Sequence, residues 1–163
     1  MKPADFTKTF PKLAHRLGKQ NTVFLTTLIS ERDMPVGGVL LESQVPLDAL
    51  FLVIDGEFRV EVARRDGVLE IGRIGHGKWI GETQLFSDDH ISTSCVIADI
   101  PSRVLQLQHS QFWTARIEHP DLVSALTREF ENQMTECIRA TDELITRNLQ
   151  GETLFLASTP NPR

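Results

Sequence analysis

An apolar pattern of helical period runs through the first thirty residues. The apolar side chains recur at spacings of four, three and four residues, at Phe6, Phe10, Leu13 and Leu17. This spacing predicts helix within residues 5–30. Pro11 interrupts the stretch, so we expect a break or a first helical turn there. The β-branched run over residues 22–29 fits either a helix or a strand.

From residue 34 the pattern changes to short strands and tight turns. Residues 50–54 form a continuous apolar run, which is typical of a strand buried on both faces. Residues 58–62 alternate apolar and charged side chains, as in a half-buried strand. Asp66 and Gly67 give a strong hairpin signal before a return strand. Further strands are expected over residues 39–41, 93–98 and 103–107. The spacing of the turns indicates an antiparallel roll, barrel or sandwich.

The helical period returns after residue 108. Ser110 is a candidate cap for a short helix through Ile117. A longer helix is expected from Asp121 to Leu149, with Gly151 as its stop. Its apolar stripe contains Leu122, Leu126, Phe130, Met134, Ile138, Thr141, Ile145 and Leu149.

This second helix would be roughly 40 Å long, which is more than a roll of this size can cover. We therefore expect the stripe to pack partly on a second copy, giving a homodimer through the C-terminal helix. The alternative is a helix folded wholly against its own roll.

Composition bounds the class of protein. The chain has 163 residues, of which 40% are hydrophobic, and this favours one globular domain. No apolar run reaches the roughly 18 residues of a membrane span, and the N-terminus lacks the features of a signal peptide. The widely separated Cys95 and Cys137 fit a reducing compartment. We therefore expect a cytoplasmic protein without membrane contact.

Charge and motifs argue against several functions. The net charge is −5, and the only compact basic cluster is Arg64-Arg65, so nucleic-acid binding is not expected. The five histidines are scattered without a His-x-His pair, which argues against a metal-dependent enzyme. No nucleophile elbow, Walker loop or dinucleotide fingerprint is present. We expect no catalytic residue, no metal and no cofactor.

The segment Ile74-Gly75-His76-Gly77-Lys78-Trp79-Ile80-Gly81-Glu82, with Leu85-Phe86 after it, carries a resemblance. It resembles the phosphate-binding cassette of the cyclic-nucleotide-binding domain family, and residues 92–98 are similar to the strand that follows the cassette. Residues 35–40, 48–60 and 111–120 resemble three more pieces of the family, in the right order.

The resemblance implies a mainly β fold. This is an eight-stranded antiparallel β-roll of the jelly-roll or cupin-like kind, with N-terminal helices and a long C-terminal helix. The expected organisation is a helical segment over residues 1–30, the roll over 31–109, C-terminal helices over 110–149 and a tail over 150–163.

The resemblance also implies a ligand pocket. Gly81 would let the backbone approach the ligand beside Thr83, and Glu82 would accept a hydrogen bond from a ribose 2′-hydroxyl; the alternative is a surface glutamate after a turn. The family's phosphate-pairing arginine falls at Ser92, followed by Thr93. Losing a charge-assisted hydrogen bond costs about 1.5–3 kcal/mol, so tight cAMP binding is not expected.

The base of a nucleotide would meet Ile71 on the roll and Cys137 and Ile138 on the long helix, with Thr141 one turn further on. The alternative is that Ile71 is plain core and that Cys137 and Ile138 are helix-packing residues.

Two functions from different classes remain. One is a sensor domain that couples a cyclic nucleotide or a nucleoside in a ribose-recognising pocket to its long helix. The other is a ligand-independent interaction or dimerisation module with a vestigial pocket. Too few residues follow the long helix for a DNA-binding domain. Any output would pass through the helix, the tail or a separate effector protein.

Overall fold

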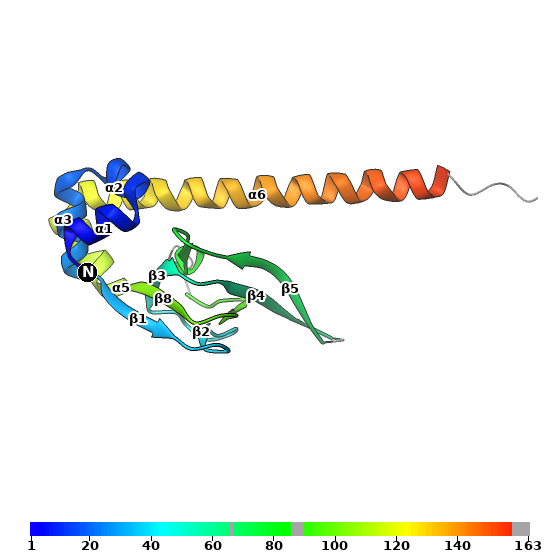
Figure 1. Cartoon of the computed structure of the whole chain (residues 1–163), viewed down its shortest axis with the longest axis horizontal. Helices are drawn as coiled ribbons and strands as arrows, with labels where there is room; N and C mark the ends of the chain where they lie inside the picture. Colours follow the sequence, from blue (N-terminus) through cyan, green and yellow to red (C-terminus); the bar gives the residue numbers. More distant parts are fainter. Residues whose placement is uncertain (66, 86–89, 158–163) are drawn as a thin grey trace, which may run out of the picture. The chain divides into compact units, whose positions relative to one another are not determined.

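The structure is a computed structural model that describes residues 1–65, 67–85 and 90–157, with side chains described as far as Arg139. The chain divides into two compact units, Met1–Thr127 and Arg128–Arg163. Of the described residues, the first unit contains the strands, three N-terminal helices, two further helices and the start of the long helix α6, and residues 128–157 of the second unit continue α6 (Figure 1).

Three short helices open the chain: α1 (Pro3–Thr9), α2 (Pro11–Leu17) and α3 (Lys19–Leu28). Pro11 occupies the first turn of α2, where its missing N–H costs nothing, so the prediction at this residue is confirmed. Residues 22–28 of the ambiguous β-branched run are helical. Gly18 separates α2 from α3 with a φ of 79°, a conformation that glycine adopts at little cost.

In the part of the chain that the structure describes, eight antiparallel strands form two four-stranded sheets, as expected for the roll. One sheet has the order β1-β8-β3-β6 and the other β2-β7-β4-β5. The strands are β1 (Ser30–Met34), β2 (Val39–Leu41), β3 (Ala49–Asp55), β4 (Phe58–Arg64), β5 (Gly67–Ile74), β6 (Trp79–Ile80), β7 (Cys95–Ala98) and β8 (Ser102–Gln108).

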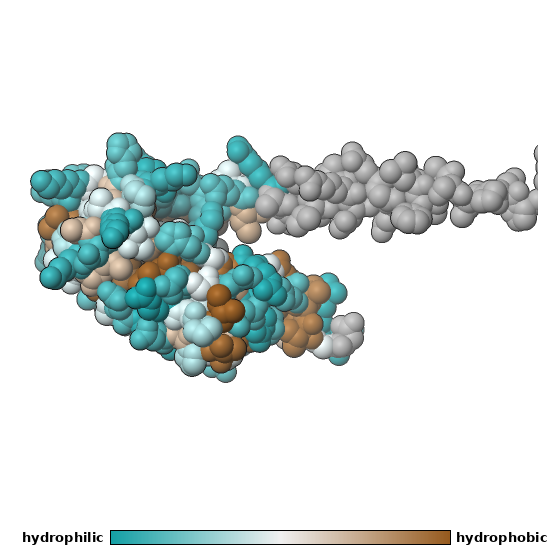
Figure 2. Space-filling view, in the orientation of Figure 1, coloured by the Kyte–Doolittle hydropathy of each residue, from teal (hydrophilic) through white to brown (hydrophobic). Residues whose placement is uncertain are grey.

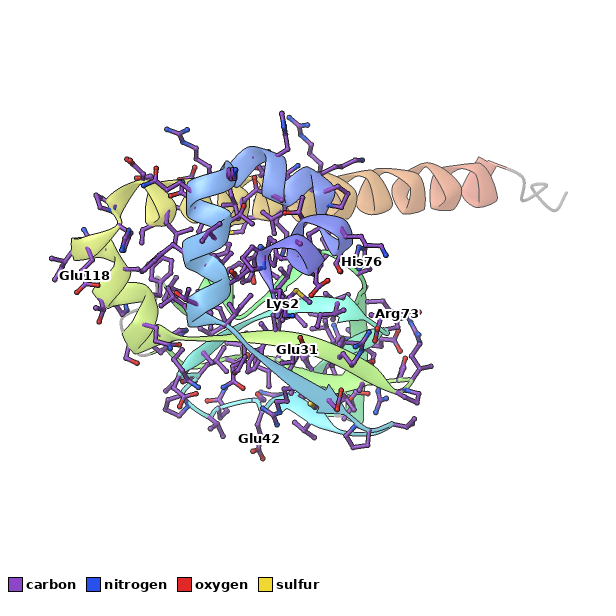
Figure 3. All side chains as sticks on the ribbon, turned by 60° about the vertical axis from the view of Figure 1, so that its left-hand side comes forward. Lys2, Glu31, Glu42, Arg73, His76 and Glu118 are labelled. Carbon is purple, nitrogen blue, oxygen red and sulfur yellow. The ribbon has the colours of Figure 1, made fainter. Side chains whose placement is uncertain are left out.

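The core of the roll lies between the two sheets. Phe51 and Val53 of β3 face Phe58 of β4 and Val96 of β7 in one buried cluster. The alternate residues of β3, Leu50, Leu52 and Ile54, are also buried. The N-terminal helices lie over that side of the sheet (Figure 3). The continuous apolar run therefore forms a strand that is covered on both faces, as its sequence predicts.

Two expectations about the C-terminal helices are wrong in detail. Helix α5 (His109–Glu118) begins one residue before Ser110, and its N-cap is Gln108, whose N–H donates to Gln111 Oε1 at 3.2 Å. Ser110 thus lies inside the first turn and does not cap the helix.

Helix α6 (Pro120–Ala157) begins one residue before Asp121 and continues through Gly151. A glycine inside a helix costs about 1 kcal/mol relative to alanine, which helix-forming neighbours can offset. Gly151 is therefore not a stop, and residues 150–157 of the expected tail are helical. Within the described ranges, no helix is both long and apolar enough to span a membrane.

Candidate functional site

The cassette-like segment is fixed to the most buried strand of the roll. Val53 of β3 donates its N–H to Lys78 O at 3.0 Å and accepts the N–H of Gly77 at 2.9 Å. Strand β6 then pairs with β3, placing Ile80 opposite Phe51 and Trp79 opposite Leu52. The segment therefore reaches Gly81 on a rigid support.

Gly81 turns the chain from β6 into the one-turn helix α4 (Glu82–Leu85). Its φ is +95°, which L side chains rarely adopt. A Cβ at this position would lie 2.5 Å from Leu47 Cδ2 and 3.0 Å from Ala49 O. Glycine is thus required here by the turn and by close packing against the segment that leads into β3.

Glu82 and Thr83 form the start of α4. Glu82 is half-buried, and Thr83 is exposed with its hydroxyl donating to Gln84 Oε1 at 2.9 Å. The turn closes through the bond from Leu85 N–H to Gly81 O at 3.3 Å. The carboxylate expected to recognise a ribose therefore stands directly after the Gly81 turn.

Ser92, at the position expected for a phosphate-pairing arginine, is fully buried. Its hydroxyl donates to Ser94 O at 2.8 Å and accepts the N–H of Ser94 at 3.2 Å. Thr93 beside it is exposed. The Ser92 hydroxyl is thus engaged inside its own turn, just before β7.

The loop before β3 is joined to residues 90–92, which come between α4 and β7 and are called here the end of the cassette. Gln44 N–H donates to Ser92 O at 2.8 Å, and Leu47 N–H donates to His90 O at 2.9 Å. Pro46 and Ile91 form an isolated antiparallel bridge between these two bonds. Sequence reasoning missed Leu47, and only its place just ahead of the buried strand could have marked it.

Ile71 lies at an irregularity of the β4–β5 hairpin. The register pairs Val60 with Gly72 and Glu61 with Glu70, so Ile71 has no partner residue in β4. Its side chain is 57% exposed, and so it is not plain core. A bulge of this kind changes the direction of a side chain locally.

The other residues expected to meet a base lie on α6. Cys137 is exposed, and the Ile138 side chain is 60% exposed. The backbone of Thr141 is helical, and its side chain lies outside the described ones. Both residues are exposed in the single chain, which fits contact with a base as well as packing on a second copy.

His76 connects the cassette segment with the N-terminal helices (Figure 3). Its Nδ1 lies 2.6 Å from Ile54 O, and its ring stacks on Phe10 with centroids 5.2 Å apart. Because a carbonyl oxygen only accepts, Nδ1 carries the proton. A lone histidine between two glycines gave no sequence signal for this contact.

Two arginines of the β4–β5 hairpin are engaged by carboxylates. Arg73 contacts Glu57 at 2.6 Å and Asp99 at 2.8 Å, and Arg59 contacts Glu61 at 2.6 Å. The hydrogen bond to Glu57, followed by that to Glu70, raises the pKa of Arg73 above its usual range. Both arginines are therefore committed to ion pairs.

No group of three or more histidine, cysteine or acidic side chains in the described part of the chain could hold a metal ion.

Comparison with known families decides the class of the domain. The family model described as "Cyclic nucleotide-binding domain" matches residues 31–119. The chain belongs to this family. The match begins at the second residue of β1 and ends between α5 and α6, so it covers the cyclic-nucleotide-binding roll from that residue onward.

Solved structures share the fold at low sequence identity. A cyclic nucleotide-binding domain from Methylobacillus flagellatus KT superposes with a TM-score of 0.77 at 19% identity, covering 88% of this chain and 85% of that one. The catabolite activator protein of Thermus thermophilus gives 0.66 at 20% identity, covering 81% and 62%.

A third similar structure is the regulatory subunit of a cAMP-independent protein kinase A from Trypanosoma cruzi, bound to guanosine. Its TM-score is 0.63 at 18% identity, covering 76% of this chain and 43% of that one. The chain thus spans less than two thirds of the activator protein and of the kinase subunit. No curated protein sequence matches the chain.

Proposed function

We propose that this domain is a regulatory sensor whose pocket, bounded by Gly81, Glu82, Thr83, Ser92 and Thr93, takes a ribose-bearing ligand without a cyclic phosphate. The ligand class is a nucleoside. Occupancy of the pocket would be transmitted to the long C-terminal helix.

The engagement of Ser92 is the observation that carries this proposal. A cyclic phosphate needs a charged donor at this position, and the chain offers a buried hydroxyl that is already bonded to Ser94. A charge-assisted hydrogen bond contributes about 1.5–3 kcal/mol, so its loss lowers affinity by roughly 10- to 150-fold. Arg59 and Arg73 do not compensate, because carboxylates already engage them.

The retention of Glu82 supports the ribose half of the proposal. Glu82 is half-buried at the start of α4, and its carboxylate oxygens can accept a hydrogen bond from a ribose 2′-hydroxyl. Guanosine in the related Trypanosoma cruzi subunit is a precedent for a nucleoside on this fold. Ile71, Cys137, Ile138 and Thr141 are the residues we propose for contact with the base.

The output in this proposal is the C-terminal helix. Its apolar positions suit packing on a second copy, giving a homodimer, and the helix or tail could engage a separate effector protein. No catalytic step forms part of the proposal.

The test compares ligands that differ by one hydroxyl. Adenosine and guanosine are titrated into the ligand-stripped protein by calorimetry, each beside its 2′-deoxy counterpart. We expect at least one ribonucleoside to bind about 10- to 150-fold more tightly than its deoxy form, because the deoxy form lacks the hydroxyl that would donate to the Glu82 carboxylate.

The Glu82→Gln variant should reduce that ratio toward one. The control is Glu118→Gln, which alters an exposed glutamate at the end of α5 and should leave the ratio unchanged (Figure 3). Light scattering on the same samples reports whether ligand changes the oligomeric state. Absence of heat with every nucleoside would overturn the sensor proposal in favour of a ligand-independent interaction module.

A further inference from the structure

Two histidine rings join the end of the cassette to the start of α5. The ring of His90 meets the ring of His109 edge to face, with centroids 5.5 Å apart and planes at 60°. Neither residue has a role in the proposed recognition of a ribose. Their contact connects the end of the cassette with the helix that leads toward α6.

His90 has an unusual backbone conformation and is held in place by two hydrogen bonds. Its φ is +54°, which is uncommon for a residue other than glycine. Its carbonyl accepts the N–H of Leu47 at 2.9 Å. Its Nδ1 donates to Gln84 O at 2.6 Å, because that oxygen can only accept. The ring is thereby fixed against α4 and presents its remaining edge to other groups.

His109 is the first residue of α5 and is 8% exposed. Its backbone N–H donates to Asp48 O at 2.7 Å, which anchors the start of the helix. Among the described residues, its buried Nε2 has no hydrogen-bond partner. A buried polar atom without a partner costs about 1–3 kcal/mol, and a buried charge costs more.

Charge on His109 is therefore disfavoured in the folded state. Burial, and then the neighbouring His90, lower the pKa of His109 below its usual 6.5, against a smaller opposing effect of Asp48. Asp48 is exposed and lies in the loop before β3. It is the nearby anion toward which a charged ring could turn.

We infer that the His90–His109 contact is a proton-sensitive latch between the cassette and α5. With His109 neutral, the buried ring packs on His90 and the latch is closed. Protonation adds a charge to a buried ring whose Nε2 has no hydrogen-bond partner among the described residues, so the ring leaves toward Asp48 and solvent. The start of α5 then separates from the cassette, and α5 leads directly into α6. This inference does not depend on whether a nucleoside binds.

The sign of the pH dependence follows from the depressed pKa. The unfolded chain takes up the proton of His109 near pH 6.5, and the folded protein takes it up only at lower pH. The contribution to stability is therefore complete above pH 6.5 and is lost as the pH falls through the folded-state pKa.

The test measures amide hydrogen exchange in α5 of the full chain as a function of pH. Between pH 7.5 and 5, we expect the amide protection factors of residues 109–118 to fall, by up to about tenfold per pH unit for a one-proton linkage. His109→Phe keeps a ring without a titrating nitrogen and should remove this dependence. If that variant does not fold, His109→Gln tests the same point.

Two further variants separate a latch from a purely structural contact. His90→Gln removes the neighbouring charge while keeping a donor for Gln84 O, so it should raise the His109 pKa toward 6.5 in a proton NMR titration. His15→Gln, which alters an exposed histidine of α2, should change neither readout. A His109 that titrates at or above pH 6.5, or unchanged pH dependence in both His109 variants, would overturn the latch.

Discussion

Strands β3 and β5 are similar in length but differ in burial and in their position within the sheet. In β3, six consecutive residues are buried, whereas seven of the eight residues of β5 are exposed. β3 lies between β8 and β6, and β5 is the edge strand beside β4. Apolar side chains of β5 remain at the surface, with Val68 66% and Ile71 57% exposed, on the hairpin where Figure 2 shows brown surface.

This difference means that β3 supports the fold, whereas the β4–β5 hairpin presents residues at the surface. The cassette takes its position from β3, through the bonds of Val53 and the pairing of β6. The β4–β5 hairpin contributes buried Phe58 to the core and packs partly buried Val60 and Ile74 against it, while the other apolar residues of β5 remain at the surface. We therefore expect substitutions in β3 to lower stability most, whereas the hairpin carries Ile71, which we propose for contact with a base.

The largest expected effect comes from replacing one leucine in each of the two strands by alanine. Leu52→Ala, in a fully buried position of β3, should lower the free energy of unfolding by about 2–5 kcal/mol. Leu69→Ala, at a position of β5 that is 39% exposed, should cost under about 1 kcal/mol. Urea denaturation monitored by circular dichroism measures both, and equal losses would refute the division between the strands.

A smaller effect on stability is expected when two glycines of the cassette are each replaced by alanine. Gly81→Ala and Gly77→Ala both place a side chain at positive φ, at a shared cost of about 1–2 kcal/mol. Only Gly81 packs against Leu47 and Ala49, while nothing lies within 4 Å of a Cβ at Gly77. Gly81→Ala should thus be less stable than Gly77→Ala by about a further 1–3 kcal/mol. Thermal unfolding measures both variants. Equal midpoints for the two would contradict the packing of Gly81 against Leu47 and Ala49.

The fold follows from the sequence wherever a local rule decides the structure. Pro11 starts a helix because its ring suits the first turn, and residues 50–54 are buried because both faces are apolar. The expectations at Ser110 and Gly151 fail because their signals are weak alone. Gln108 and Gln111 form the cap of α5, and one glycine does not end a helix with helix-forming neighbours.

The site is less accessible to sequence reasoning because it depends on distant contacts. The motif locates Ser92, but that its hydroxyl bonds to Ser94 is a property of the folded turn. Leu47, His90 and His109 come together only when the loop before β3 meets the end of the cassette. No periodicity or motif marks such a meeting point.

The central claim is that the pocket accepts a ribose and rejects a cyclic phosphate. Titration of one ligand-stripped preparation with cAMP and with adenosine, and with cGMP and guanosine, tests it most directly, because each pair differs only in the phosphate. We predict that a nucleoside binds at least about tenfold more tightly than its cyclic phosphate. Micromolar or tighter binding of cAMP or cGMP, exceeding that of the matching nucleoside, would contradict it.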